Sequence, residues 1–341
     1  MSAVYPSPPA GAASPLPDPV APDPVPQRLV DLEEIRDAAD RIVGVAVHTP
    51  LLASPWPGLW LKPEGLQPIG AFKIRGAMTA MSRLAPEVRA RGVIAHSSGN
   101  HAQAVAYAAK VFGVDAHIVI PENAPAKKID ATRALGATVE LVPVEQRFSR
   151  PLELAAQTGQ AVIAPFDDRN VIAGQGTIGL EIAQDAGDGL RTVLVPVSGG
   201  GLISGVAAAL AALRPNVRVI GVEPELAGDA ADSFRAGERR AWSPADTART
   251  VADGLRTFSV GVLPWEHIRQ QVHDIITVTE DEILDATRQL AVQARLVAEP
   301  SGAVATAAWL FHRDQLPAGD AVAIVSGANV DPAVFRSVLD R

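Results

Sequence analysis

The chain has 341 residues and no cysteine, and this absence excludes several kinds of chemistry. Without thiols the protein has no disulfides, no cysteine-ligated zinc, no iron–sulfur cluster and no thiol nucleophile. Basic residues are outnumbered by acidic ones, and the formal net charge is −8. A negative balance of this size argues against nucleic acid as the natural partner.

Long apolar runs and a basic amino-terminal segment are also missing. No stretch of about 18 residues is free of glycine, proline and charge, so no membrane-spanning helix is predicted. Residues 1–27 contain nine prolines and no lysine or arginine, whereas a signal peptide or a mitochondrial transit segment needs basic residues. We predict a disordered, polyproline-like tail and a cytoplasmic protein that binds no membrane.

After the tail, short β-branched runs alternate with alanine-rich helical stretches, which predicts parallel sheets covered by helices on both faces. The expected strands are Leu59–Leu61, Val93–Ala95, His117–Ile120, Thr138–Val142, Ala161–Ile163, Thr192–Val197, Val217–Val222, Ile275–Val278 and Ala321–Val325. The expected helices are Ile74–Arg83, Asn100–Phe112, Ala126–Leu135, Leu152–Thr158, Thr177–Asp185, Leu202–Leu213, Glu280–Arg295 and Ala303–Phe311. Ligands of such folds sit beyond the carboxyl ends of the strands.

One lysine lies in a context that suits covalent catalysis. Lys73 stands between Phe72 and Ile74, just after a glycine-containing turn and at the start of an expected helix. Apolar neighbours remove hydration from the charged amine and lower its pKa, so that it can act as nucleophile and base. Amines of this kind form Schiff bases with carbonyl compounds, including pyridoxal phosphate. The alternative is a solvated lysine in the first turn of a helix.

Two loops between a strand and a helix suit an anion. The run His96–Gln103 reads H-S-S-G-N-H-A-Q, and Val197–Leu202 reads V-S-G-G-G-L. Small residues let backbone N–H groups approach an anion, and the positive end of the following helix favours negative charge. We therefore predict that the second loop is a phosphate cradle rather than a flexible turn.

Two further motifs are weaker. Gly174–Gly179 matches G-x-G-x-x-G, but no clear strand precedes it, so we interpret it as close packing at a helix start and not as dinucleotide binding. The acidic loop Glu223–Asp229 offers oxygen ligands that suit Mg²⁺ or Ca²⁺, although a solvated loop explains it equally well. Ser326, at the end of the last strand, either donates to a ring nitrogen or caps the turn.

Taken together, the motifs resemble the pyridoxal phosphate (PLP) enzymes of fold type II, in the serine/threonine dehydratase and serine racemase family. The resemblance covers residues 30–331 and rests on the order of the motifs Ala71–Gly76, Ser97–Gln103, Val171–Ile178, Ser198–Gly201, Ala252–Gly254, Glu299–Ala303 and Ser326–Asn329.

This resemblance implies an α/β, tryptophan synthase β-like fold of two domains, each an open and mostly parallel sheet flanked by helices. Residues 28–90 and 166–341 would form a large PLP-binding domain, and residues 91–165 a small mobile domain. Relatives are commonly homodimers.

The resemblance also assigns roles to residues. Lys73 carries the cofactor, and the other residues implied to bind it are Phe72, Asn100, Ser198, Gly199, Gly200, Gly201, Leu202 and Ser326. The substrate carboxylate falls to Ser97, Ser98, Asn100 and His101, and Ser98 is implied as a second acid/base opposite Lys73. A divalent cation, Mg²⁺ or Ca²⁺, falls to Glu223, the carbonyl of Ala227 and Asp229.

The function implied is PLP-dependent deamination of L-threonine or L-serine to a 2-oxo acid and ammonia. Ser98 keeps serine racemase open as an alternative, alone or beside elimination, and 3-hydroxyaspartate is an alternative substrate. Outside PLP chemistry the alternatives are a nicotinamide-linked oxidoreductase and a non-catalytic binding protein. The chain departs from the family pattern at Ile69 and Ala71, where missing hydroxyls bear on placement of the substrate, and at Ser198 and Ala328, which stand in place of glycines.

Overall fold

The computed structural model describes residues 28–97, 99–124 and 126–341, and their strands form two sheets. The six-stranded sheet has the order β1-β2-β10-β7-β8-β9 and the four-stranded sheet the order β5-β4-β3-β6. Among the strand pairs of the described residues, β1–β2 is antiparallel and the others are parallel. The strands are β1 (Leu52–Ala53), β2 (Leu59–Pro63), β3 (Val93–His96), β4 (Ala116–Pro121), β5 (Thr138–Val142), β6 (Ala161–Val162), β7 (Leu190–Pro196), β8 (Arg218–Pro224), β9 (Asp274–Val278) and β10 (Asp320–Val325).

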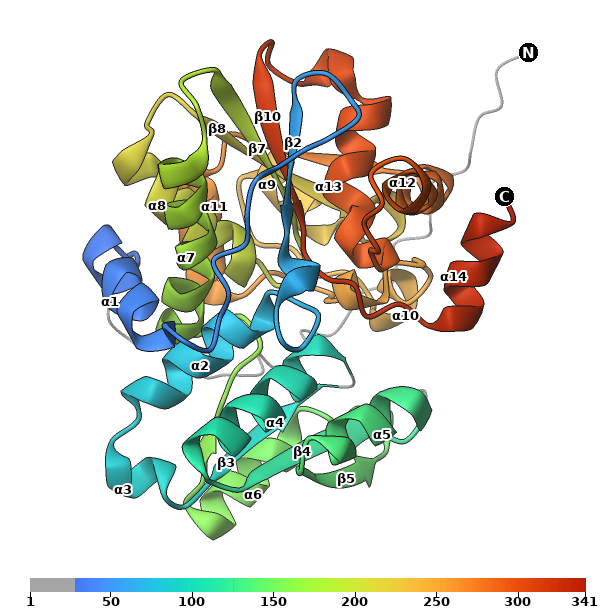
Figure 1. The fold of residues 1–341 in the computed structure, drawn as a ribbon. Helices are drawn as coiled ribbons and strands as arrows, with labels where there is room; N and C mark the ends of the chain where they lie inside the picture. The colour runs from blue at the N-terminus through green and yellow to red at the C-terminus, as the bar shows by residue number, and fades with distance from the viewer. Residues whose placement is uncertain (1–27, 98, 125) are drawn as a thin grey trace.

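Helices cover both faces of the six-stranded sheet, as Figure 1 shows. One apolar cluster joins this sheet to α12 and α13, and a second joins its other face to α7, α8 and α11. The helices are α1 (Leu32–Ile42), α2 (Lys73–Arg83), α3 (Pro86–Arg89), α4 (Asn100–Phe112), α5 (Ala126–Ala134), α6 (Ser149–Thr158), α7 (Arg169–Asp185), α8 (Gly201–Leu213), α9 (Asp229–Ala236), α10 (Pro244–Thr247), α11 (Val262–Gln271), α12 (Glu280–Val292), α13 (Pro300–Phe311) and α14 (Pro332–Leu339).

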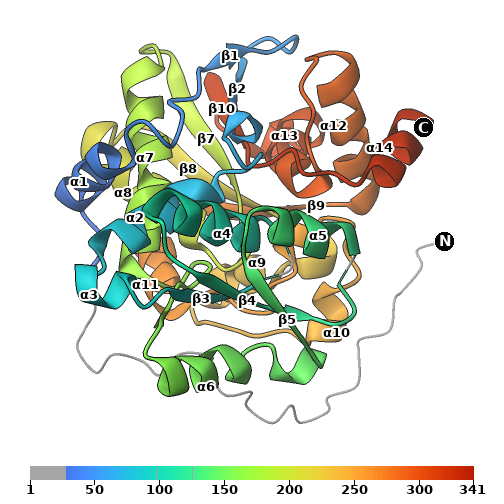
Figure 2. The ribbon, with the colours of Figure 1, turned by 60° about the horizontal axis from the view of Figure 1, so that its bottom comes forward.

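The four-stranded sheet lies beside the larger one, with α2 and α4 on the side between them (Figures 1 and 2). A third apolar cluster packs α2 and α4 against this sheet. Every strand of the smaller sheet comes from the part of the chain between Val93 and Val162. The expected α/β architecture of two mostly parallel sheets flanked by helices is therefore confirmed, whereas the exact domain limits and the mobility of residues 91–165 stay predictions.

The main departure from the expected elements is α7, which begins at Arg169 and not at Thr177. The side chain of Asp168 accepts hydrogen bonds from the backbone N–H groups of Asn170 and Val171 and caps the helix. The G-x-G-x-x-G run consequently lies inside the helix and not at its start.

The close packing expected of that run is present. A side chain added at Gly174 would meet the backbone of α2, and one at Gly179 would meet the backbone of Val206 in α8. The glycines let α7 approach both neighbouring helices closely, and the run lies within a helix instead of in the strand-to-helix turn of a dinucleotide site.

Residues 228–253 are buried at their start and mostly exposed from residue 235 to residue 249. They contain α9 and α10, and the first turn of α9 is buried. The tail, residues 1–27, lies outside the described residues. No helix in the described part of the chain is both long and apolar enough to cross a membrane.

Candidate active site

Lys73 is the first residue of α2 and is half-buried. Its Nζ donates a hydrogen bond of 2.7 Å to the carbonyl of Pro165 and lies 5.1 Å from the centroid of the Phe72 ring. Burial lowers the pKa of the amine to about 8. Since no acidic group offsets this loss of hydration, a substantial neutral fraction exists near physiological pH, as a nucleophilic lysine requires.

The loop before Lys73 is fastened to the end of the last strand. The N–H of Phe72 donates to the carbonyl of Ser326, the N–H of Ala328 donates to the carbonyl of Gly70, and Ala71 forms an isolated bridge with Gly327. Gly70 has φ +72°, a conformation that favours glycine. These bonds hold Lys73 in place from the residues that directly follow β10, near the other end of the chain.

The glycine loop faces the same segment that accepts the lysine hydrogen bond. Gly201 begins α8, and a side chain added there would meet the backbone of Phe166 at 3.0 Å. A side chain added at Gly199 would overlap the Phe166 ring, and Gly200 has φ +90°. Because Phe166 follows Pro165, the acceptor of Lys73 and the floor of the glycine loop are consecutive residues.

The loop has free donors for an anion. No side chain caps α8, and neither Gly199 nor Gly200 donates its backbone N–H to another described residue. The hydroxyl of Ser198 is instead bonded to that of Thr257 at 2.7 Å, which fixes the loop from behind. Unpaired N–H groups at the positive end of a 13-residue helix fit a phosphate.

Ser97, Asn100 and His101 lie around the start of α4, beyond the carboxyl end of β3. Ser97 Oγ accepts from the N–H of Gly99 at 3.1 Å. His101 is buried, its Nε2 lies 2.9 Å from the carbonyl of Ile163, and burial together with the positive Lys73 lowers its pKa to about 3. A neutral imidazole with one nitrogen already bonded leaves only Nδ1 for a ligand. Ser98 lies outside the described residues.

The side chain of Asn100 forms hydrogen bonds with two residues that lie far from it in the sequence, Glu299 and Asn329. Its Nδ2 donates to Glu299 Oε1 at 2.7 Å, and its Oδ1 accepts from Asn329 at 2.8 Å. Ser326 is 4% exposed and its hydroxyl makes no hydrogen bond to a described residue, so it is available to a ligand.

Sequence reasoning missed an arginine at this end of β3. The guanidinium of Arg147 stacks 4.4 Å from the Phe148 ring, and that ring meets His96 edge-on at 5.1 Å. Burial, with the charge of Arg147 second, lowers the pKa of His96 to about 4. Arg147 has no ion pair with any described acidic residue, and burial lowers its own pKa. Only its neighbourhood in space, not its spacing in sequence, marks it as part of the site.

Behind Lys73 the structure buries four charged side chains. Arg75 forms ion pairs with Glu64 at 2.8 Å and Glu181 at 2.6 Å, and Lys62 pairs with Glu181 at 2.6 Å. Two cations and two carboxylates leave the cluster neutral, and it ties α2 to β2 and α7. Sequence reasoning missed this cluster as well.

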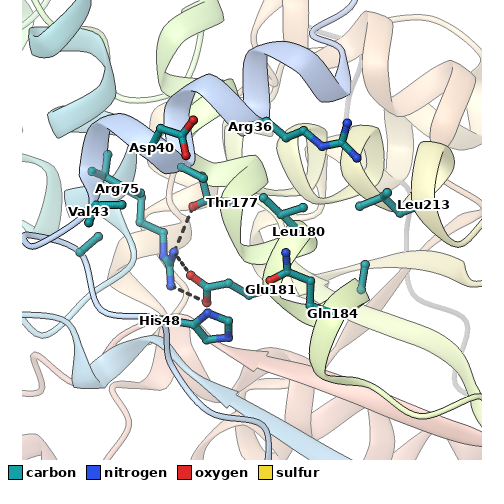
Figure 3. A pocket seen from close by; sticks show the side chains of 14 residues that line it. Arg36, Asp40, Val43, His48, Arg75, Thr177, Leu180, Glu181, Gln184 and Leu213 are labelled. Atoms are coloured by element: carbon teal, nitrogen blue, oxygen red, sulfur yellow. Dashed lines mark hydrogen bonds and ion pairs between the residues drawn. The ribbon is translucent and has the colours of Figure 1, made fainter.

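A surface hollow of about 680 Å³ lies on the far side of this cluster, between α1 and α7 (Figure 3). Figure 3 shows Arg75 reaching Thr177 and Glu181 at its floor, with His48 beside them. The hollow does not include Lys73 or the glycine loop, so it is not the site of the chemistry.

The predicted cation site brings two carboxylates together. Glu223 is the last residue but one of β8 and Asp229 begins α9, and both are fully buried. Burial, and then repulsion from Asp229, raises the pKa of Glu223; burial raises that of Asp229 to about 8. Neither carboxylate oxygen of Asp229 has a partner among the described residues, a deficit that a cation would remove. No cluster of three or more histidine or acidic side chains suited to a metal occurs in the described part of the chain, and the metal site with its Ala227 carbonyl stays a prediction.

Known proteins are similar to this chain in sequence and in fold. The chain is 42% identical over 324 residues to L-threonine ammonia-lyase of Thermotoga maritima, covering 92% of this chain and 79% of that one. It is 40% identical over 314 residues to L-threo-3-hydroxyaspartate ammonia-lyase of Saccharomyces cerevisiae, covering 90% and 95%. The structure of maize serine racemase superposes with a TM-score of 0.86 at 37% identity, covering 92% and 98%. Residues 44–327 match the family described as pyridoxal-phosphate dependent enzyme, and the chain belongs to that family.

Proposed function

We propose that this enzyme eliminates water from a β-hydroxy amino acid of the threonine and serine class and releases a 2-oxo acid and ammonia. The observation that carries the proposal is the Lys73 amine, held at the Pro165 carbonyl with its pKa lowered to about 8, in front of a glycine loop with free N–H groups. The similarity to L-threonine ammonia-lyase supports the reaction class.

The residues present fit the cofactor. Lys73 would bond its aldehyde carbon, the first turn of α8 with Ser198–Leu202 would hold its phosphate, and Phe72 would lie against its ring. Ser326 would face the ring nitrogen, and Asn100 the ring 3-oxygen. When bound, the cofactor supplies an electron-withdrawing ring that stabilises negative charge on the substrate's α-carbon.

The chain supplies proton transfer and orientation. In its free neutral form Lys73 Nζ takes the α-proton, because burial keeps the amine from holding a proton as tightly as a solvated lysine does. Ser97, Asn100 and His101 would place the substrate carboxylate at the start of α4, where the helix end favours negative charge.

The test is to map the reactive lysine. Borohydride reduction of the purified holoenzyme should place a pyridoxyl group on Lys73, and Lys73→Ala should lose cofactor absorbance and turnover while keeping its circular dichroism spectrum. Lys110→Ala, an exposed lysine in the last turn of α4, is the matched control and should behave as the wild type. A tag on another lysine, or turnover by Lys73→Ala, would disprove the assignment.

The Arg147 side chain supports a second candidate substrate, an acidic amino acid such as 3-hydroxyaspartate. A half-buried guanidinium without a carboxylate partner, beside the loop expected to bind substrate, suits a second carboxylate on the substrate. The similarity to L-threo-3-hydroxyaspartate ammonia-lyase supports this choice.

Kinetics on both substrates decide between the two. Arg147→Met should lower kcat/KM for 3-hydroxyaspartate by roughly 10- to 100-fold, the effect of one lost charged hydrogen bond, and should leave threonine nearly unchanged. Arg150→Met is the control, because the guanidinium of Arg150 already pairs with Glu140. Equal losses on both substrates would show that Arg147 does not read the second carboxylate. The racemase alternative, for which Ser98 is the key residue, is tested by incubating the enzyme with L-serine and measuring the D-serine in the recovered amino acid.

We also propose that Glu223, the Ala227 carbonyl and Asp229 bind Mg²⁺ or Ca²⁺. The support is the pair of buried carboxylates and the unpartnered oxygens of Asp229. Either ion should raise the melting temperature of the metal-stripped wild type, and Asp229→Asn should abolish the response. An equal response in Asp229→Asn would refute the site.

We also propose that the protein is cytoplasmic and, by resemblance, a homodimer. Val43 is 75% exposed and Val47 is 43% exposed, close to the hollow between α1 and α7, and exposed apolar residues of this kind suit a subunit contact. Light scattering of the purified protein measures the mass directly.

A further inference from the structure

We propose that Glu299 is a positioning residue that fixes the orientation of the Asn100 amide and thereby presents an Asn100 N–H to the cofactor's ring oxygen. This inference rests on the proposed placement of the cofactor. It assigns a role to an acidic side chain that the sequence marks only as part of a motif and that touches neither the reacting atoms nor the proposed metal ligands.

The position of Glu299 argues against an ordinary structural role. Glu299 precedes the first residue of α13, where a side chain usually caps the helix, yet it makes no capping hydrogen bond. It is 4% exposed and its described hydrogen bond from a side chain comes from Asn100, at 2.7 Å. A buried carboxylate turned away from its own helix is held there by this contact.

The hydrogen bonds around Asn100 have a fixed direction. The Ile69 carbonyl can only accept, so it binds the Nδ2 of Asn329 at 2.8 Å. The same Nδ2 donates to Asn100 Oδ1, which leaves Asn100 Nδ2 to donate to Glu299. An ionised carboxylate can only accept. The Ile69 carbonyl and the Glu299 carboxylate, at the two ends of this series of hydrogen bonds, therefore select the same orientation of the Asn100 amide. In it one N–H of Asn100 donates to Glu299 and the second N–H is free.

The backbone leaves room for this contact. Gly327 lies against both partners, since a side chain added there would come within 2.5 Å of Glu299 Oε1 and 3.2 Å of Asn100 Nδ2. Gly327 has no positive φ, so its conformation does not require glycine. The need for space for the Asn100–Glu299 hydrogen bond accounts for the missing side chain.

The charges around Glu299 place its ionisation in the working range of an enzyme. Burial, and then repulsion from Asp253, raises the pKa of Glu299 to about 7, while the hydrogen bond from Asn100 and the charge of Lys128 act in the opposite direction. Asp253 and Lys128 also form an ion pair with each other. Below this pKa a protonated Glu299 no longer holds the Asn100 N–H by its charge, so Asn329 alone fixes the amide and the alignment of the second N–H weakens.

The absorbance spectrum of the bound cofactor reports this orientation without measuring activity. An N–H directed at the ring oxygen favours the tautomer with negative charge on that oxygen, which absorbs at long wavelength. A weaker N–H contact favours the protonated ring oxygen, which absorbs in the near ultraviolet. The wild-type ratio of the two bands should change with a midpoint near pH 7. In the Glu299→Gln holoenzyme that dependence should vanish, and the ratio above the midpoint should shift roughly ten-fold toward the near ultraviolet, as expected for one lost charge-assisted hydrogen bond.

Two variants outside the site should move the midpoint of the pH-dependent band ratio in opposite directions. They keep the inference testable if Glu299→Gln does not fold. Asp253→Asn should lower the midpoint by roughly one pH unit because it removes a negative neighbour, and Lys128→Met should raise it. A wild-type band ratio in Glu299→Gln, or a midpoint unmoved in both other variants, would overturn the inference. Absence of a borohydride tag on Lys73 in the wild type would instead refute the proposed function.

Discussion

Replacing Arg75 with methionine tests a charge that is almost completely buried. The Arg75 side chain is 1% exposed and donates to both oxygens of Glu64, to both oxygens of Glu181, to Thr177 and to the carbonyl of Val47. Methionine preserves much of the volume but leaves Glu64, which is fully buried, without its counter-charge. Removal of one partner from a buried ion pair costs about 3–5 kcal/mol.

The loss should depend on pH in a direction that the structure fixes. Burial alone would raise the pKa of Glu64, but the charge and hydrogen bonds of Arg75 outweigh it and hold the pKa below its usual value. In the wild type this carboxylate stabilises the fold above pH 4.5 and the contribution is lost as the pH falls through the lowered pKa. In Arg75→Met the pKa of Glu64 rises instead, so protonation relieves the variant and the difference from the wild type shrinks in acid.

Thermal unfolding of the two proteins between pH 5 and 8 measures this. At neutral pH we expect the melting temperature to fall by roughly 5–10 °C. Arg41→Met is the control, since its partner Asp37 is largely exposed and such a pair contributes at most about 1 kcal/mol. A loss below about 1 kcal/mol, or one that is the same at every pH, would show that the cluster does not act through its charges.

Three further outcomes follow from single contacts. Gly199→Ala should weaken cofactor retention because its methyl group overlaps the Phe166 ring, whereas Gly187→Ala, with open space around it, should leave retention unchanged in the same dialysis assay. Gly205→Ala should destabilise the protein by about 1–3 kcal/mol in urea unfolding, since the methyl group meets the backbone of α7. In the cofactor-free protein Lys73 should react with an amine reagent with a midpoint near pH 8, well below exposed lysines, as peptide mass spectrometry over a pH series would show.

The sequence predicts most of the elements because their local signals agree with their surroundings. The helix expected over Asn100–Phe112 has those limits in the structure, and its end is marked by Gly113 in the left-handed conformation. For α7 the signals conflict, since three glycines disfavour a helix interior by their intrinsic propensity. Packing of α7 against α2 and α8 outweighs that cost, and packing is not visible along one segment of sequence.

The candidate site divides in the same way. Local composition is enough to predict Lys73 and the glycine loop as site residues. In the structure Lys73 contacts Pro165 and the glycine loop contacts Phe166. The partners of Asn100 are 199 and 229 residues away, and no local pattern pairs them. Arg147 looks like any surface arginine until its distance from acidic side chains is known.

The position of β10 has a consequence for how the protein is made. This strand is among the last elements to leave the ribosome, yet it lies between β2 and β7, and its end fastens the loop that carries Lys73. A nascent chain that stops before residue 326 lacks the anchor for its own reactive amine. We expect that growing chains cannot bind the vitamin B6 cofactor. We also expect that their unpaired sheet edges are prone to aggregation, and need protection by chaperones, until synthesis is nearly complete.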